Sequence, residues 1–252
     1  MTKKSEIESF WDFVGRFEDY IGSGIAKEHE PFVFAKVDND QRRTPVSGAV
    51  SDDFLEYKEL SDREKNLEWQ RCCENMKGCC LCGLSSIRHS VVPGTAAQKF
   101  DLLVIGDYPS AQEDSSGRNS GAAFEYLGKW LNSIEAAVGE NAAYASVLKC
   151  CPGSLAEIDS FTVGACRPYL ERQMAIASPK VILATGSLFL RWFLNSKEPL
   201  PAARGRLFEY RSIPVIVTYD PQTVLNESGL RRPVWEDLKT VRRLLNNRLI
   251  ND

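Results

Sequence analysis

The chain has 252 residues, of which 26% are charged and 43% hydrophobic, and its formal net charge at pH 7 is −3. This composition is that of an ordinary globular protein and excludes a disordered or fibrous chain. The sequence has no apolar run of about 18 residues that could span a membrane, and its first residues do not resemble a signal peptide. We therefore expect a cytoplasmic protein that does not act at a membrane.

The N-terminal part of the chain reads as helical but carries no recognisable motif. Apolar residues recur at helical spacing over residues 5–22, residues 26–50 show no periodicity, and a second helical stretch over residues 51–76 begins with Ser51 as a cap. We interpret residues 1–70 as a mostly helical N-terminal extension, which either docks a protein partner or simply packs. Residues 71–252 form the expected main domain.

From residue 100 onward, short apolar runs alternate with helical stretches. We expect strands in residues 100–107, 142–150, 179–186 and 213–219, and helices in residues 122–139, 162–178, 187–195 and 232–249. This alternation is typical of an α/β protein with a mostly parallel sheet. In such sheets the functional residues gather in the loops that follow the strands, which here read "GDYPSAQED", "KCCPGS", "TGS" and "YDPQ".

All eight cysteines lie in the middle of the chain, between residues 72 and 166. In a reducing compartment such clustering indicates a metal site more than disulfides. Cys79 and Cys82 form a C-x2-C pair, and Cys150 and Cys166 are separated by 15 residues. Four thiolates could hold a zinc ion or an iron–sulfur cluster, and the spacing does not separate these two.

Several short motifs follow one another in a family-like order. They are "CxLxxxR" (Cys82, Leu84, Arg88), "VIGDYPSAQEDSSGR", "LKC", "ACRPYLERQ", "PKVILATG", "RG" and "VTYDPQ…VWEDLK". In this order, over residues 76–243, the chain resembles the family 4 uracil-DNA glycosylases, bacterial and archaeal repair enzymes that carry a [4Fe-4S] cluster. The resemblance implies a three-layer α/β/α sandwich, a monomer, base excision, and damaged duplex or single-stranded DNA as partner.

The same resemblance assigns roles to the cysteines. It implies that a structural [4Fe-4S] cluster is held by four ligands, Cys79, Cys82, Cys150 and Cys166. Cys80 and Cys151 are neighbours of these ligands, and we interpret the pair at residues 72 and 73 as free thiols on the preceding helix. Zinc, or no metal, is the alternative.

The expected active site departs from the family pattern at several positions. The family's "GEAPG" loop reads "GDYPS" here, so Asp107 keeps the acid one methylene shorter and Tyr108 replaces a small residue. Ser120 stands where the family has the phenylalanine that stacks on uracil, and Ser146 where it has the asparagine that reads the base edge. Asp220 stands where the family has the histidine of its "HPS" loop.

Each departure weakens the recognition of uracil. Loss of the aromatic platform removes about 1–3 kcal/mol of base stacking, although Phe124 could supply a substitute if it is not simply core. A serine hydroxyl reads a base edge less sharply than an amide. An ionised Asp220 would repel a departing uracil anion, and only a protonated one could donate a hydrogen bond to it.

Two interpretations of these acids remain open. In the first, the chain is an active glycosylase with a rebuilt pocket, in which Asp107 and Asp220 position water and stabilise the cationic sugar. In the second, it is a non-catalytic iron–sulfur protein that binds DNA or acts as a scaffold, and Asp107 merely caps its own loop. A redox sensor built on the extra cysteines is the third and weakest hypothesis.

The C-terminal part of the chain carries the expected DNA contacts. Residues 1–78 hold 12 basic and 17 acidic side chains, and much of the later basic excess lies near the C-terminus. By resemblance, Val224 or Leu225 would be the apolar wedge that enters the duplex, with Arg231 and Arg232 near phosphates. Alternatively, Leu225 begins a helix and the arginines are solvated surface.

Overall fold

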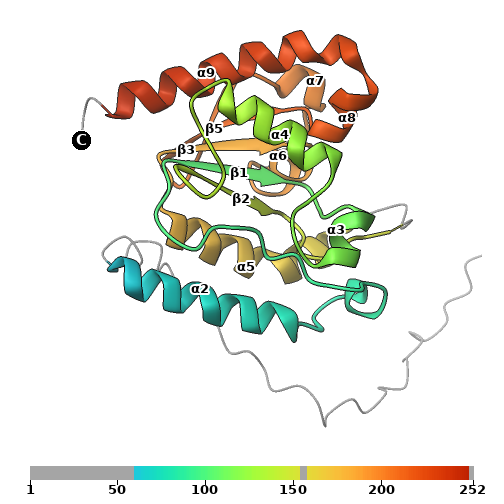
Figure 1. Cartoon of the computed structure of the whole chain (residues 1–252). Coiled ribbons are helices and arrows are strands. Elements are labelled where there is room, and N and C mark those ends of the chain that lie inside the picture. The colour runs from blue at the N-terminus through green and yellow to red at the C-terminus, as the bar shows by residue number, and fades with distance from the viewer. Residues whose placement is uncertain (1–59, 154–157, 250–252) are drawn as a thin grey trace, which may run out of the picture. The chain divides into compact units, whose positions relative to one another are not determined.

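A computed structural model of the protein describes residues 60–153 and 158–249 (Figure 1). The helix expected over residues 5–22 and the Ser51 cap lie outside the described residues. The chain divides into two compact units, residues 1–48 and 49–252, and the fold described here belongs to the second. None of the described helices is both long and apolar enough to cross a membrane.

A five-stranded sheet forms the centre of this unit. Its strands are β1 (Leu102–Gly106), β2 (Ala142–Ser146), β3 (Val181–Thr185), β4 (Leu207–Tyr210) and β5 (Ile213–Thr218). Their spatial order is β2-β1-β3-β5-β4, with parallel pairing throughout except for β4, which runs antiparallel to β5. The mostly parallel sheet predicted from the sequence is confirmed, and the carboxyl ends of four strands meet at one edge.

Helices cover both faces of the sheet, so the expected three layers are present (Figure 1). One face packs against α5 (Ser160–Ala177), α6 (Leu188–Trp192) and α7 (Leu200–Ala203). The other packs against α4 (Ala122–Asn132), α8 (Pro221–Asn226) and α9 (Arg231–Leu249). Because successive strand residues point to opposite faces, β1 contributes Leu103 and Ile105 to the first core and Leu102 and Val104 to the second.

Helix α2 (Asp62–Lys77) lies against α5 and leads directly into the C-x2-C pair. It begins at Ser61, where the Ser61 hydroxyl and the Glu64 carboxylate satisfy each other's backbone N–H groups in a capping box. The helix runs without a break across residue 70, where the sequence analysis ended the N-terminal extension. Its last residue is Lys77, and Gly78 is its C-cap. This end delivers Cys79 next to the sheet.

Two elements differ from the sequence prediction. The helix expected over residues 122–139 ends at Asn132, and Glu135 then takes a left-handed conformation with φ 62° that no helix can continue. Strand β4 was not predicted. Its residues alternate between exposed and half-buried within a charged stretch, because it pairs only along the outer edge of β5.

A buried ion pair fastens α9 to β5. Asp237 is 2% exposed; its carboxylate accepts from Arg204 Nε at 3.0 Å and from Thr218 Oγ1 at 2.6 Å, and Arg204 Nη2 also donates to the Pro233 carbonyl. A single member removed from such a group leaves an uncompensated buried charge.

We therefore expect Arg204→Met to lower the free energy of unfolding by about 3–5 kcal/mol, measured by urea denaturation. The matched control is Arg206→Met, which removes an exposed ion pair to Glu198 and should change stability by about 1 kcal/mol or less. Equal effects of the two substitutions would contradict this assignment.

Candidate active site and thiol pocket

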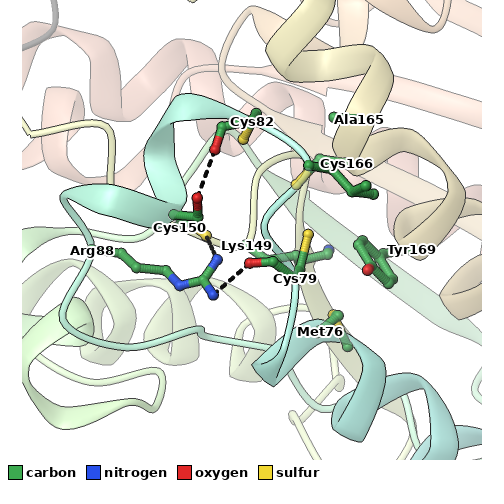
Figure 2. A pocket seen from close by; sticks show the side chains of 11 residues that line it. Met76, Cys79, Cys82, Arg88, Lys149, Cys150, Ala165, Cys166 and Tyr169 are labelled. Carbon is green, nitrogen blue, oxygen red and sulfur yellow. Dashed lines mark hydrogen bonds between the residues drawn. The ribbon is translucent and has the colours of Figure 1, made fainter. Parts of the chain in front are cut away.

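The four predicted cysteine ligands line one pocket (Figure 2). Cys79 and Cys82 follow α2, Cys150 follows β2, and Cys166 lies on α5, so three separate parts of the chain meet here. The remaining lining residues are Met76, Leu81, Ser85, Arg88, Lys149, Ala165 and Tyr169. The structure therefore brings together the side chains that the sequence proposed as one set.

Two cationic side chains belong to the same pocket. Arg88 donates from Nη1 to Cys150 Sγ at 3.3 Å and from Nη2 to the Cys79 carbonyl at 2.7 Å. Lys149 is 2% exposed and donates to the Ser146 carbonyl. Burial lowers the pKa of Lys149 to about 8, against the opposing effect of thiols that include Cys166. Positive charge placed this way favours thiolate ligands.

The four thiols of this pocket can be compared with what a single metal ion and an iron–sulfur cluster each require. Within the described ranges, no three His, Cys, Asp or Glu side chains are grouped closely enough to hold one metal ion. Thiolates hold either a tetrahedral zinc ion or an iron–sulfur cluster. The four thiols that line this pocket suit both groups in kind and number.

The other four cysteines differ from this set in their surroundings. Cys80 is exposed and Cys151 half-buried, and neither lines the pocket. Cys72 is buried and Cys73 half-buried, and neither of them lines the pocket. Burial raises the pKa of both thiols, as it does for Cys150 and Cys166 inside the pocket, so the pKa does not separate the two sets. None of the eight cysteines, all of which the structure describes, forms a disulfide.

Asp107 lies at the carboxyl end of β1 and is bound by a neighbouring loop. Its carboxylate accepts from the backbone N–H groups of Ser187 at 3.0 Å and Leu188 at 2.8 Å. It therefore caps α6 and not its own loop. Burial raises the pKa of Asp107 to about 6; the two N–H bonds oppose this shift, and the charge of Asp220 adds to it.

Gly186 makes this contact possible. The residue has φ +101°, and a Cβ atom added to it would lie 2.4 Å from the Asp107 carboxyl group. Both the conformation and the close approach require glycine at this position. The loops after β1 and β3 can therefore make this contact only because Gly186 has no side chain.

Asp220 lies at the carboxyl end of β5 as the N-cap of α8. Its carboxylate accepts from Thr223 N at 3.0 Å and from the Thr223 hydroxyl. It therefore acts as a hydrogen-bond acceptor. Tyr108 is 45% exposed, and its pKa is raised by partial burial and by the charges of Asp107 and Asp220, which places the three side chains at the same edge of the sheet.

The two serines proposed for the base pocket bond to their own segments. Ser120, in the turn before α4, lies with its hydroxyl 3.2 Å from that of Ser116. Ser146 is 2% exposed, and its hydroxyl donates to the Leu148 carbonyl at 2.7 Å. The Ser146 hydroxyl proton is therefore already engaged in a hydrogen bond within the chain.

The residues expected to contact DNA fall into two groups. Val224 is fully buried in the core beneath α8, so the structure leaves Leu225, which is half-buried, as the candidate wedge. Val224 belongs to the core cluster that also contains Leu238 of α9. Arg231 and Arg232 are exposed at the start of α9.

Sequence reasoning missed Tyr144, which lies on β2 and packs edge-on against Phe124 with ring centroids 5.4 Å apart. A Cβ atom added to Gly106 would lie 2.2 Å from the Tyr144 hydroxyl, so the phenol reaches the loop that contains Asp107. Burial and the carboxylates of Glu113, Asp107 and Asp220 raise its pKa. Its position two residues before Ser146 was the available signal.

Comparisons with known proteins show which family the chain belongs to. A model of the uracil DNA glycosylase superfamily matches residues 93–239, which is more than half of the chain. The chain therefore belongs to the uracil DNA glycosylase superfamily, as a divergent relative of its type-4 members.

Type-4 uracil-DNA glycosylases from several organisms are similar to this chain in sequence. The protein from Thermotoga maritima is 31% identical over 66% of this chain and 88% of its own length. The one from Sulfurisphaera tokodaii is 29% identical over 68% of this chain and 82% of its own length. Among solved structures, SMUG2 of Pedobacter heparinus shares 11% identity over 59% of this chain and 77% of that chain, with a TM-score of 0.39.

We expect Gly186→Ala to displace Asp107 and to lower the free energy of unfolding by about 1–3 kcal/mol, because alanine is strained at positive φ and its methyl group would meet the carboxylate. Gly128→Ala is the control, since no atom lies within 4 Å of an added Cβ on this helical residue. That substitution should instead stabilise the protein by about 0.5–1 kcal/mol. Thermal and urea unfolding of both variants measure the difference, and an unchanged Gly186→Ala protein would contradict the contact.

Proposed function

We propose that this protein is a DNA base-excision repair glycosylase that hydrolyses the N-glycosidic bond of uracil or another deaminated base. The observation that carries this proposal is that Asp107 and Asp220 follow β1 and β5 at the same carboxyl edge of the sheet, in a chain of this superfamily. The relatives named above are uracil-DNA glycosylases. Such enzymes must take the target base out of the stack before they can reach its glycosidic bond.

The two carboxylates have a role that does not require a histidine. Cleavage of the glycosidic bond develops positive charge on the sugar, and fixed negative charges beside it stabilise that state. Asp107 is held by two backbone N–H groups and keeps further acceptor sites that could orient the attacking water. Asp220 adds its charge from the neighbouring loop. Tyr108, the most exposed of the three, would bound the entrance.

The DNA contacts follow from the arrangement of α8 and α9. Leu225 would enter the space left by the extruded base, and Arg231 and Arg232 would contact phosphates. We further propose that the protein acts as a monomer in the cytoplasm. A partner for the extension at residues 1–70 is a separate part of the proposal.

We also propose that Cys79, Cys82, Cys150 and Cys166 hold a [4Fe-4S] cluster. When bound, the cluster supplies cross-linking of the segment after α2 to β2 and α5, and no step of the hydrolysis. Arg88 and Lys149 would offset the charge of the thiolates. Their placement in the pocket beside the four thiols supports this assignment.

An excision assay tests the function. Excess protein is incubated with labelled oligonucleotides that carry uracil, hypoxanthine, xanthine or a thymine mismatch, single-stranded and paired, and abasic sites are then cleaved with alkali. We expect strand breaks at uracil or another deaminated base. Asp107→Asn should reduce the rate by about 100-fold, and the rate of the unchanged protein should fall as pH drops below about 6, where Asp107 becomes protonated.

Two substitutions sharpen this assay. Asp220→Asn removes a charge while keeping an equally good helix cap, and we expect a loss of about tenfold. Asp101→Asn neutralises an acid at the opposite end of β1 and should leave the rate unchanged. If no substrate is cleaved while duplex DNA is still bound, the non-catalytic alternative replaces this proposal.

The cluster assignment has its own test. We expect anaerobically purified protein to be brown, with about four iron atoms per chain, and the separate variants Cys79→Ser and Cys166→Ser to lose most of this iron. Cys80→Ser and Cys151→Ser, each next to a proposed ligand in sequence, should retain it. Colourless protein that contains zinc, or equal iron loss in both pairs of variants, would overturn the assignment.

A further inference from the structure

Tyr144 places a hydroxyl group at the edge of the sheet where the two acids meet. Gly106 and Ser146 are paired across β1 and β2, and the side chains of residues 144 and 146 lie on the same face of β2. The phenol extends two residues along the strand, so that its oxygen lies beside Gly106. It thus covers the position next to Ser146, where the sequence placed base recognition.

The hydroxyl has no hydrogen-bond partner within the described part of the chain, although the Tyr144 backbone N–H donates to Thr95 Oγ1 at 2.9 Å. Tyr144 as a whole residue is half-buried. Among the described residues, the side-chain polar atoms that are fully enclosed and have no partner are Gln173 Oε1 and Trp192 Nε1. The Tyr144 oxygen is not one of these enclosed atoms. The Tyr144 oxygen is therefore both unpaired and within reach of solvent or a ligand.

The surrounding groups leave the role of donor to Tyr144. Asp107, Glu113 and Asp220 are all acceptors of hydrogen bonds from backbone N–H groups. Ser146 donates to its own chain. Burial, and then the charges of these three carboxylates, disfavour loss of the phenol proton, which raises the pKa of Tyr144 and keeps its O–H group intact at neutral pH.

We propose that Tyr144 is a specificity-determining residue whose hydroxyl donates a hydrogen bond to the ring carbonyl of the excised base. Deamination converts an amino group into such a carbonyl, so one donor at this position recognises the product of deamination. This inference rests on the proposed function and adds the residue that reads the base. A phenol O–H rotates less freely out of the ring plane than a serine hydroxyl, and the edge contact with Phe124 fixes the ring.

Binding of uncleavable DNA tests the proposal without requiring activity. Duplexes carry 2′-fluoro-2′-deoxyuridine, which resists glycosidic cleavage, or its 4-thio derivative, in which sulfur replaces the carbonyl oxygen as a weaker acceptor. Fluorescence anisotropy gives the dissociation constants. We expect the unchanged protein to bind the uracil duplex about tenfold more tightly than the thio duplex, and Tyr144→Phe to bind the two about equally.

Tyr126→Phe is the matched control, because it removes the same oxygen from a tyrosine that packs on Trp130 within α4. It should keep the tenfold preference. A preference of the unchanged protein that Tyr144→Phe retains, or the absence of any preference in the unchanged protein, would overturn the proposal. Circular dichroism and thermal unfolding of the variants separate loss of recognition from loss of fold.

Excision of ordinary uracil duplex is measured in parallel, so that the two proposals can fail separately. If the unchanged protein prefers the uracil duplex but does not cleave, the proposed function fails and the role of Tyr144 in recognition stands. If it cleaves and Tyr144→Phe cleaves equally well with the same binding preference, only the role of Tyr144 fails. We expect Tyr144→Phe to reduce kcat/KM for uracil by about tenfold.

Discussion

The contact between the Asp107 carboxylate and the backbone at residues 186–188 sets the geometry of the whole carboxyl edge of the sheet. A carboxylate that is partly withdrawn from solvent requires donors, and two backbone N–H groups at the start of α6 supply them. The acid can approach these groups only because Gly186 has no side chain. The acid is thereby held in one orientation, and the loops after β1 and β3 are joined. The carboxylate that we propose to be catalytic is therefore also a structural cap.

The thiol pocket shows a related solution to the problem of buried charge. Arg88 binds the Cys79 carbonyl as well as Cys150 Sγ, so the segment after α2 is fastened to the end of β2 by hydrogen bonds of the protein itself. Lys149 comes from the sheet side and is almost fully enclosed. Two cations from different segments therefore lie beside four potential anions, which reduces the electrostatic repulsion among thiolates gathered in one place.

The parallel strands were predictable because each is a short apolar run buried on both faces, such as Leu102–Gly106. Strand β4 was not, since an edge strand with exposed charges has no apolar run to reveal it. The sequence placed Asp107 and Asp220 at strand ends, but the partners of Asp107 lie 80 and 81 residues further along the chain. Such partners follow from strand register, which one sequence does not determine.

The same limit explains what the sequence left open or missed at individual residues. Val224 and Leu225 are both apolar, and only the orientation of a short helix decides which of them is buried. Tyr144 lies among alanines in a strand, where an aromatic residue reads as core. Its reach depends on the missing side chain of Gly106 on the adjacent strand. Neither a hydrophobic pattern nor a motif contains that information.

The position of the cysteines along the chain has a consequence for how the pocket assembles during synthesis. Cys79 and Cys82 leave the ribosome early, whereas Cys166 is made only after β1, α4 and β2. Closing so long a loop is unfavourable until strand pairing has brought its ends together. The first pair of thiols must therefore wait, exposed and unpaired, for the sheet and α5. During that interval the thiols of the nascent chain are most open to oxidation.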